Sequence, residues 1–157
     1  MINTKDRIRL KSISYRINER LIFKNLSIKF ALKGITIILG PNGSGKSLLT
    51  KILKGLIKPE SGNVNIQLNG KSPRIGYLSQ RMIFLRRNVF SNLAYPMEIK
   101  GYEARYIRQR VSSLLQDFEF IGKEKDSARN LSFGNKQYLS FIRTLVNNPN
   151  FLILDEP

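Results

Sequence analysis

The sequence contains no cysteine and no histidine among its 157 residues. Without cysteine, a disulfide, a thiolate nucleophile and a cysteine metal site are all excluded. Without histidine, the chain lacks the usual base at neutral pH and the commonest metal ligand. Any enzymatic chemistry must therefore rely on carboxylates, on backbone dipoles or on a hard cation held by oxygen ligands.

Long apolar runs are also missing. Stretches such as Ile35–Leu39 and Phe151–Leu154 fall far below the roughly 20 residues that cross a bilayer. The first six residues are mostly polar, and no apolar segment with a small-residue cleavage site follows them. We therefore expect neither a membrane span nor a secretory signal, and we expect a cytoplasmic location.

Acidic residues are scarce. The chain has 11 Asp and Glu against 27 Lys and Arg, a net charge of +16, and the cations are dispersed along it. Such a charge favours nucleic acid, nucleotide phosphates or an acidic membrane surface as neighbours, without choosing among them. The hydrophobic fraction of 41% is typical of a globular protein, and the length suits one modest domain or a piece of one.

Short apolar runs separated by polar or glycine positions predict β-strands in the first half of the chain and at its end. From Lys46 the spacing of leucine and isoleucine changes to that of an amphipathic helix, which Pro59 and Gly62 are expected to close. A second helical region is predicted from about Val89 to Val146. The expected strands are Ile8–Ile13, Leu26–Phe30, Ile35–Leu39, Val64–Leu68, Arg74–Leu78 and Phe151–Leu154.

A glycine-rich segment between a predicted strand and a predicted helix matches the pattern G-x-x-x-x-G-K-[ST] without a mismatch. Its residues are Gly40, Pro41, Asn42, Gly43, Ser44, Gly45, Lys46 and Ser47. In this pattern the backbone N–H groups and the helix N-terminus surround a phosphate, Lys46 reaches the terminal phosphates, and the Ser47 hydroxyl can ligate Mg²⁺. The alternative, a chance Gly/Ser turn before a helix, is much rarer, so the segment predicts binding of a nucleoside triphosphate.

Two carboxylates follow the last predicted strand. Asp155 stands where a parallel strand beside a phosphate loop would hold Mg²⁺, and Glu156 next to it could orient or deprotonate a water that attacks the γ-phosphate. Without a phosphate loop, a solvated acidic turn would explain these residues equally well.

Together these motifs resemble the ATP-binding subunits of ABC transporters. The phosphate loop corresponds to Walker A, and Asp155 with Glu156 to Walker B. Leu131–Asn135 resembles the family signature LSGGQ, at the interval from Walker B that the family pattern leads one to expect. Phe133 replaces a glycine of the signature, and Asn135 replaces its glutamine.

The resemblance implies roles for further residues. Ser132 and Gly134 would face the γ-phosphate of ATP held by a second copy, although from the segment alone an ordinary helix capped by Ser132 is the simpler interpretation. Gln80 would approach Mg²⁺ and the attacking water, whereas a surface glutamine after a strand is the alternative. Leu48 would join the phosphate loop in binding ATP, and Tyr15 is a candidate contact for adenine.

The fold that the resemblance implies is α/β: a P-loop NTPase of the ABC type with an N-terminal antiparallel β subdomain, a partial RecA-like core and an inserted helical subdomain. We expect one domain over residues 1–157, incomplete at its C-terminus. Residues 1–85 would form the β and phosphate-loop part, 86–147 the helical subdomain and 148–157 the Walker B strand.

The function implied is an ATP-binding and ATP-hydrolysing transporter subunit. It would act in a homodimer with two sandwiched nucleotides, use ATP and Mg²⁺, and couple to an integral membrane permease at the cytoplasmic face of the membrane. The run Gln80–Arg87 is similar to tungstate- or molybdate-type uptake ATPases. The alternatives are a soluble ABC-type ATPase acting on nucleic acid or ribosomes, suggested by the charge, and an inactive truncated fragment. No motif that recognises RNA or DNA is present, so no nucleic-acid partner is expected.

Overall fold

A computed structural model describes residues 6–156 of the chain. The chain divides into two compact units, Met1–Pro73 and Arg74–Pro157. Each unit has its own sheet and at least one helix, so the protein is of mixed α/β type.

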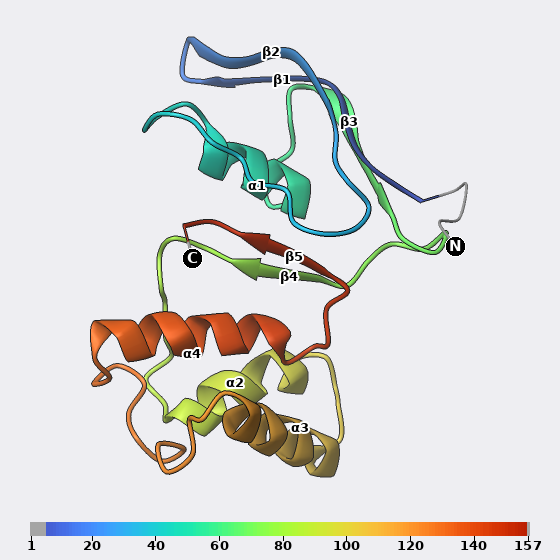
Figure 1. Cartoon of the computed structure of the whole chain (residues 1–157). Coiled ribbons are helices and arrows are strands. Elements are labelled where there is room, and N and C mark those ends of the chain that lie inside the picture. Colours follow the sequence, from blue (N-terminus) through green and yellow to red (C-terminus); the bar gives the residue numbers. More distant parts are fainter. Residues whose placement is uncertain (1–5, 157) are drawn as a thin grey trace. The chain divides into compact units, whose positions relative to one another are not determined.

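The first unit contains a three-stranded antiparallel sheet (Figure 1). Its strands are β1 (Arg7–Ile17), β2 (Arg20–Lys29) and β3 (Ser61–Gln67), in the order β2-β1-β3. Apolar and polar residues alternate from Arg7 to Lys11, which buries Ile8 and Leu10. An irregularity in the pairing between Leu10 and Ile13, where Ser12 has φ of 54°, interrupts this alternation, and Ile13 is buried as well. The predicted strands Ile8–Ile13, Leu26–Phe30 and Val64–Leu68 are confirmed, but their ends differ from those of the observed strands by up to six residues.

Helix α1 (Lys46–Lys54) belongs to the same unit and buries Leu49, Ile52 and Leu53. The apolar stripe predicted this helix correctly, but the helix ends before Pro59. Gly55 terminates it in a left-handed conformation with φ of 80°, which glycine adopts without steric cost. The last residue of the stripe, Leu56, therefore lies beyond the helix and is exposed.

The strand predicted over Ile35–Leu39 is wrong. This segment is not assigned to any strand, and Ile35, Ile37 and Leu39 are 92%, 74% and 87% exposed. A strand exists only when its backbone pairs with a neighbour, and none of the strands described in residues 6–156 pairs with this segment. The apolar pattern favours a strand locally, but a strand forms only where the backbone can pair with a neighbouring strand.

The second unit contains a two-stranded parallel sheet, formed by β4 (Ile75–Leu78) and β5 (Phe151–Leu154). The register aligns Ile75 with Phe151 and Leu78 with Leu154, so both strands end at the same edge. The predicted strands Arg74–Leu78 and Phe151–Leu154 are confirmed, the second to the residue. Gly76 is required here because a Cβ at this position would lie 2.6 Å from Leu152 Cδ2 and 2.9 Å from the Thr144 carbonyl oxygen.

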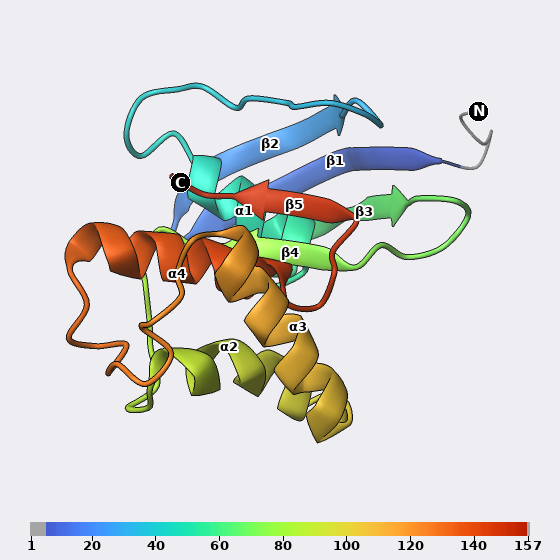
Figure 2. The ribbon, with the colours of Figure 1, turned by 60° about the horizontal axis from the view of Figure 1, so that its bottom comes forward.

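Three helices complete the second unit: α2 (Val89–Glu98), α3 (Ala104–Asp117) and α4 (Phe133–Leu145). Side chains of these helices form one apolar core. Figure 2 shows the three helices grouped together. The helical region predicted from Val89 to Val146 is confirmed. Its fully buried side chains include Val89, Leu93, Val111, Leu139 and Ile142. Among the described residues, no helix combines the length and the apolar character that crossing a membrane requires.

Candidate functional site

The predicted phosphate loop forms a turn that leads directly into α1. Ser44 N–H donates to the Pro41 carbonyl oxygen at 3.2 Å, and Gly43 and Gly45 have φ of 77° and 96°. A Cβ on Gly45 would lie 2.9 Å from Phe23 Cζ, so glycine is required here by both conformation and space. The loop is thus shaped by its glycines and fixed against β2.

The ammonium group of Lys46 closes this loop. Its Nζ donates to the carbonyl oxygens of Gly40 at 2.8 Å and Pro41 at 3.0 Å. Helix α1 begins without a side-chain cap, and the first N–H groups of a helix have no partner within the helix. Helix N–H groups, the helix dipole and a lysine charge therefore meet at one end of α1, which is an arrangement suited to an anion.

The other residues predicted to contact the nucleotide in this unit are Ser47, Leu48 and Tyr15. Ser47 and Leu48 lie in the first turn of α1 and are half-buried. Tyr15 lies on β1, half-buried, opposite Phe23 of β2.

The carboxylates predicted to act in catalysis lie in the second unit, at the shared edge of β4 and β5. Asp155 is buried, and its N–H donates to the Leu78 carbonyl oxygen at 3.0 Å. Glu156 follows it, exposed and with φ of 54°. Gln80 follows β4 and donates from Nε2 to Oε2 of Glu156 at 2.5 Å. The parallel register thus brings Gln80 and Glu156 together, although 76 residues separate them in sequence.

The signature segment lies at the start of α4. The Ser132 hydroxyl accepts a hydrogen bond from the Asn135 N–H at 3.3 Å and caps the helix, as the sequence predicts. Phe133 is 72% exposed, and a Cβ on Gly134 would have no neighbour within 4 Å. The helix N-terminus is therefore open to solvent in this unit.

Arginine contacts that the sequence analysis missed hold the segment after Gln80. Arg143 of α4 donates from Nη1 to the Ile83 carbonyl oxygen at 2.8 Å, and its guanidinium lies 4.9 Å from the centroid of the Phe84 ring. Burial lowers the pKa of Arg143 below its usual value. Arg129 donates from Nε to the Phe84 carbonyl oxygen at 3.4 Å. No local spacing signals such contacts, because their partners are backbone carbonyls 45 and 60 residues away.

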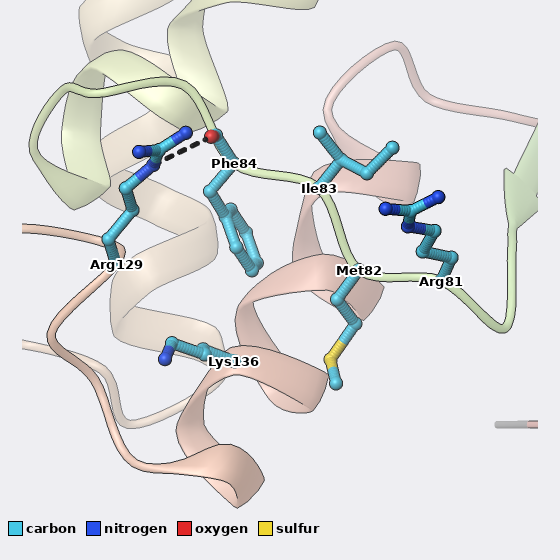
Figure 3. Close-up of a pocket in the computed structure, with 6 residues that line it drawn as sticks. All are labelled: Arg81, Met82, Ile83, Phe84, Arg129 and Lys136. Atoms are coloured by element: carbon cyan, nitrogen blue, oxygen red, sulfur yellow. Dashed lines mark hydrogen bonds between the residues drawn. The ribbon is translucent and has the colours of Figure 1, made fainter.

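A pocket of about 310 Å³ lies beside this anchored segment (Figure 3). Its polar lining is entirely basic, and no lining cation forms an ion pair with a residue of the described part of the chain, 6–156. The lining residues are Arg81, Met82, Ile83, Phe84, Arg129 and Lys136. The pocket therefore combines apolar surface with uncompensated positive charge.

The glycine loop that precedes α1 defines a P-loop nucleotide-binding domain. Residues 23–157 match the family model described as "ABC transporter". The chain therefore belongs to the ABC transporter family, as an ATP-binding domain.

Curated relatives carry related descriptions. The chain is 37% identical to the "Probable metal transport system ATP-binding protein" of Thermotoga maritima, over 96% of this chain and 61% of that protein. It is 33% identical to the energy-coupling factor transporter ATP-binding protein EcfA1 of the same organism, with the same coverage. It is 32% identical to the spermidine/putrescine import ATP-binding protein PotA of Clostridium acetobutylicum, over 96% of this chain and 45% of that protein. The chain thus spans about half to three fifths of the length of these relatives.

A solved structure supports the fold. CbiO1 of Clostridium perfringens, described as part of the ABC transporter complex CbiONQ, matches with a TM-score of 0.78 and 25% identity, over 96% of this chain and 65% of that chain. The predicted α/β fold of the P-loop ABC type is confirmed by this match and by the family model. The division into residues 1–85, 86–147 and 148–157 stays a prediction.

Proposed function

We propose that this chain binds and hydrolyses ATP as the nucleotide-binding subunit of an ABC import system. The observation that carries the proposal is the loop before α1, in which Gly43 and Gly45 shape the backbone and Lys46 lies across the loop carbonyls. A bound triphosphate would replace those carbonyl oxygens as the hydrogen-bond partner of Lys46, because a hydrogen bond from an ammonium group to a charged phosphate is stronger than one to a neutral oxygen. Residues Gly40 to Leu48 would hold the phosphates, and Tyr15 would contact adenine.

The oxygen donors predicted to hold Mg²⁺ are the Ser47 hydroxyl, the Asp155 carboxylate and the Gln80 amide oxygen. A hydroxyl, a carboxylate and an amide are ligands that suit Mg²⁺, so the donor set fits the ion. The ion, when bound, neutralises phosphate charge. Glu156 would accept a proton from the attacking water, and the Gln80 amide, which donates to its carboxylate, would hold it in orientation.

The N-terminus of α4 would serve a second copy of the chain. Ser132 caps this helix, and Phe133 and Gly134 beside it are exposed, so the helix end is accessible to a phosphate from outside the unit. A homodimer would then hold two nucleotides between its subunits.

A membrane permease would be the second partner. The pocket beside residues 81–84 fits a cytoplasmic segment of the permease that carries an acidic side chain next to apolar ones, because its own lining is basic and apolar. A permease segment bound in this pocket would contact the segment that follows Gln80. We accordingly propose a peripheral position at the cytoplasmic face of the membrane.

The choice of transported substance depends on the permease more than on this chain. The relatives' descriptions name metal transport, spermidine/putrescine import and methionine import. Import is therefore the direction that we propose. The oxyanion cargo stays a prediction that rests on the short run Gln80–Arg87.

Titration of the purified protein with fluorescent ATP and Mg²⁺ tests the proposal. Lys46→Ala should weaken affinity by roughly 10- to 100-fold, the loss of one to two charged hydrogen bonds. Lys58→Ala, an exposed lysine outside the loop, is the matched control and should bind normally. Equal affinity of Lys46→Ala and the unmodified protein would refute the phosphate-loop assignment.

Glu156→Gln separates binding from hydrolysis. This variant should bind ATP normally and release phosphate at least about 100-fold more slowly, because the amide cannot accept the proton. Normal turnover would exclude Glu156 as the base.

A pull-down experiment distinguishes transport from the soluble alternative. Isolation of the protein from membranes together with a multi-helix permease would support transport, whereas recovery with ribosomes or DNA alone would support the soluble alternative.

A further inference from the structure

One face of the three-stranded sheet is basic and free of carboxylates. The alternation that buries Ile8 and Leu10 on one side directs Arg7, Arg9 and Lys11 to the other. The register adds neighbours from β2 and β3 on that same side. We call these residues the basic face: Arg7, Arg9, Lys11, Ser27, Lys29, Asn63, Asn65 and Gln67.

The pairing across strands brings like charges side by side. Arg9 is the direct partner of Lys29 on one side and of Asn65 on the other, and Lys11 is the partner of Asn63. Directly opposed like charges destabilise an antiparallel pair. The side-chain neighbours of these cations on β3 are neutral amides, which can accept a hydrogen bond, as Gln67 does from Arg7 at 3.0 Å, but cannot neutralise charge.

Acidic residues of the first unit do not compensate this charge. Residues 1–73 contain 14 Lys and Arg against 3 Asp and Glu, a net charge of +11, whereas residues 74–157 carry only +5. Glu60 interacts with Arg16 at the far end of β1, and Asp6 accepts a hydrogen bond from the Gly70 N–H. Glu19 lies in the turn between β1 and β2. The cations are dispersed over both units, 14 in the first and 13 in the second, but the net positive charge is concentrated in the first unit because it has few acidic residues.

The composition of the basic face distinguishes between anionic partners. None of its eight residues is aromatic, whereas proteins that bind single-stranded nucleic acid on a sheet stack bases on aromatic side chains. Three strands side by side are also wider than the two-stranded ribbon that enters a DNA groove. A broad face of cations and amides suits a plane of phosphate head groups.

We propose that the basic face binds directly to the surface of an anionic lipid bilayer. This contact goes beyond the proposed transporter function, since it needs neither nucleotide nor permease. It has no apolar anchor, so it is electrostatic, reversible and strongly weakened by salt. It would hold the first unit at the membrane surface in a fixed orientation.

Flotation of the purified protein with vesicles tests the proposal. Vesicles of phosphatidylcholine with phosphatidylglycerol should bind the protein at low salt, and vesicles of phosphatidylcholine alone should not. The triple variant Arg9→Gln, Lys11→Gln, Lys29→Gln should lose roughly 100-fold in affinity, at about fivefold for each cation.

The matched control removes the same charge elsewhere in the first unit. Lys51→Gln, Lys58→Gln, Lys71→Gln changes three exposed lysines outside the three strands and should keep most of the vesicle affinity. Circular dichroism and ATP affinity, both expected to be unchanged in the basic-face variant, show that it is folded. Lys46→Ala should still bind vesicles, so failure of the nucleotide site and failure of this proposal are distinguishable.

Three results would overturn the proposal. One is the absence of binding to anionic vesicles, and another is an equal loss of affinity in both triple variants, which would assign binding to net charge. The third is tighter binding of DNA or RNA than of vesicles at the same salt through the same three residues, which would make nucleic acid the partner.

Discussion

At the scale of single residues, glycine determines the shape of the phosphate loop. Gly45 combines a left-handed backbone with contact to Phe23, so both the conformation and the space exclude a side chain. Gly134 lies in α4 with open space around it. The two glycines belong to predicted binding motifs, yet only Gly45 is fixed by the packing of its own unit.

Gly45→Ala should therefore destabilise the protein by about 2 to 4 kcal/mol, from left-handed strain and from overpacking against Phe23. Gly134→Ala is the control and should leave the stability unchanged or raise it slightly, because Gly134 lies in the first turn of α4 with open space around it. Urea unfolding followed by circular dichroism measures both. Similar stability of the two variants would contradict the close contact with Phe23.

Sequence reasoning selects candidate site residues by their local patterns, but it does not reveal the contacts that these residues make. The pattern around Lys46 and the acidic pair at Asp155 could be found because both are local. The anchoring of residues 83 and 84 by Arg143 and Arg129 could not, because backbone carbonyls carry no sequence signal. The sequence contains a sign of the basic face, because Arg7, Arg9 and Lys11 alternate with apolar residues. The residues of β2 and β3 that join this face could be found only from the strand pairing.

At the scale of elements, helix ends follow local chemistry. Asn88 caps α2 by accepting from the Ser91 N–H at 2.8 Å, and Ser132 caps α4 with a longer bond of 3.3 Å. The side-chain oxygen of each satisfies an N–H group that the helix itself cannot. Because this chemistry is encoded within three residues, the sequence predicted the cap at Ser132. The cap at Asn88 was not predicted, although its signal is equally local.

Asn88→Ala should lower the free energy of unfolding by about 1 kcal/mol, and Ser132→Ala by about 0.5 kcal/mol because its bond is longer. Ser112→Ala, at an exposed position inside α3, is the control and should be neutral or slightly stabilising. Thermal unfolding of the three variants gives the order. A larger loss for Ser132 than for Asn88 would indicate that Ser132 makes additional contacts.

Strand formation shows where local patterns fail. Ile35–Leu39 and Phe151–Leu154 are similarly apolar, but within residues 6–156 only the second has a partner strand, namely β4. The side chains of Ile35, Ile37 and Leu39 consequently form an exposed apolar row of period two. Apolar surface of this kind promotes association.

The purified chain should therefore self-associate through this row. Ile35→Ser with Ile37→Ser should weaken self-association by at least about tenfold, because burial of one isoleucine contributes about 1.5 to 3 kcal/mol. Leu56→Ser with Ile121→Ser removes two exposed but separated apolar side chains and should have little effect. Sedimentation equilibrium measures the constants, and equal values for both double variants would exclude the row as the contact.

At the scale of the whole molecule, charge is distributed unequally between the two units. The first carries +11 and the second +5 in sequences of 73 and 84 residues. Repulsion among like charges opposes folding, and salt screens it, with a Debye length of about 10 Å at 0.1 M and about 3 Å at 1 M. Added salt should thus stabilise the first unit more than the second.

Hydrogen exchange measured by mass spectrometry reports the protection of individual peptides, so it can compare the effect of salt on the two units. Raising NaCl should increase protection in peptides of β1 and β2 more than in those of α3 and α4. Arg9→Gln with Lys29→Gln removes one opposed pair and should raise protection of the sheet at low salt by about 0.2 to 1 kcal/mol, with a smaller further gain from salt. Lys51→Gln with Lys58→Gln lowers the charge equally without an opposed pair, so it should give a smaller increase. Equal responses of the two units would mean that the net charge of each unit does not govern its stability.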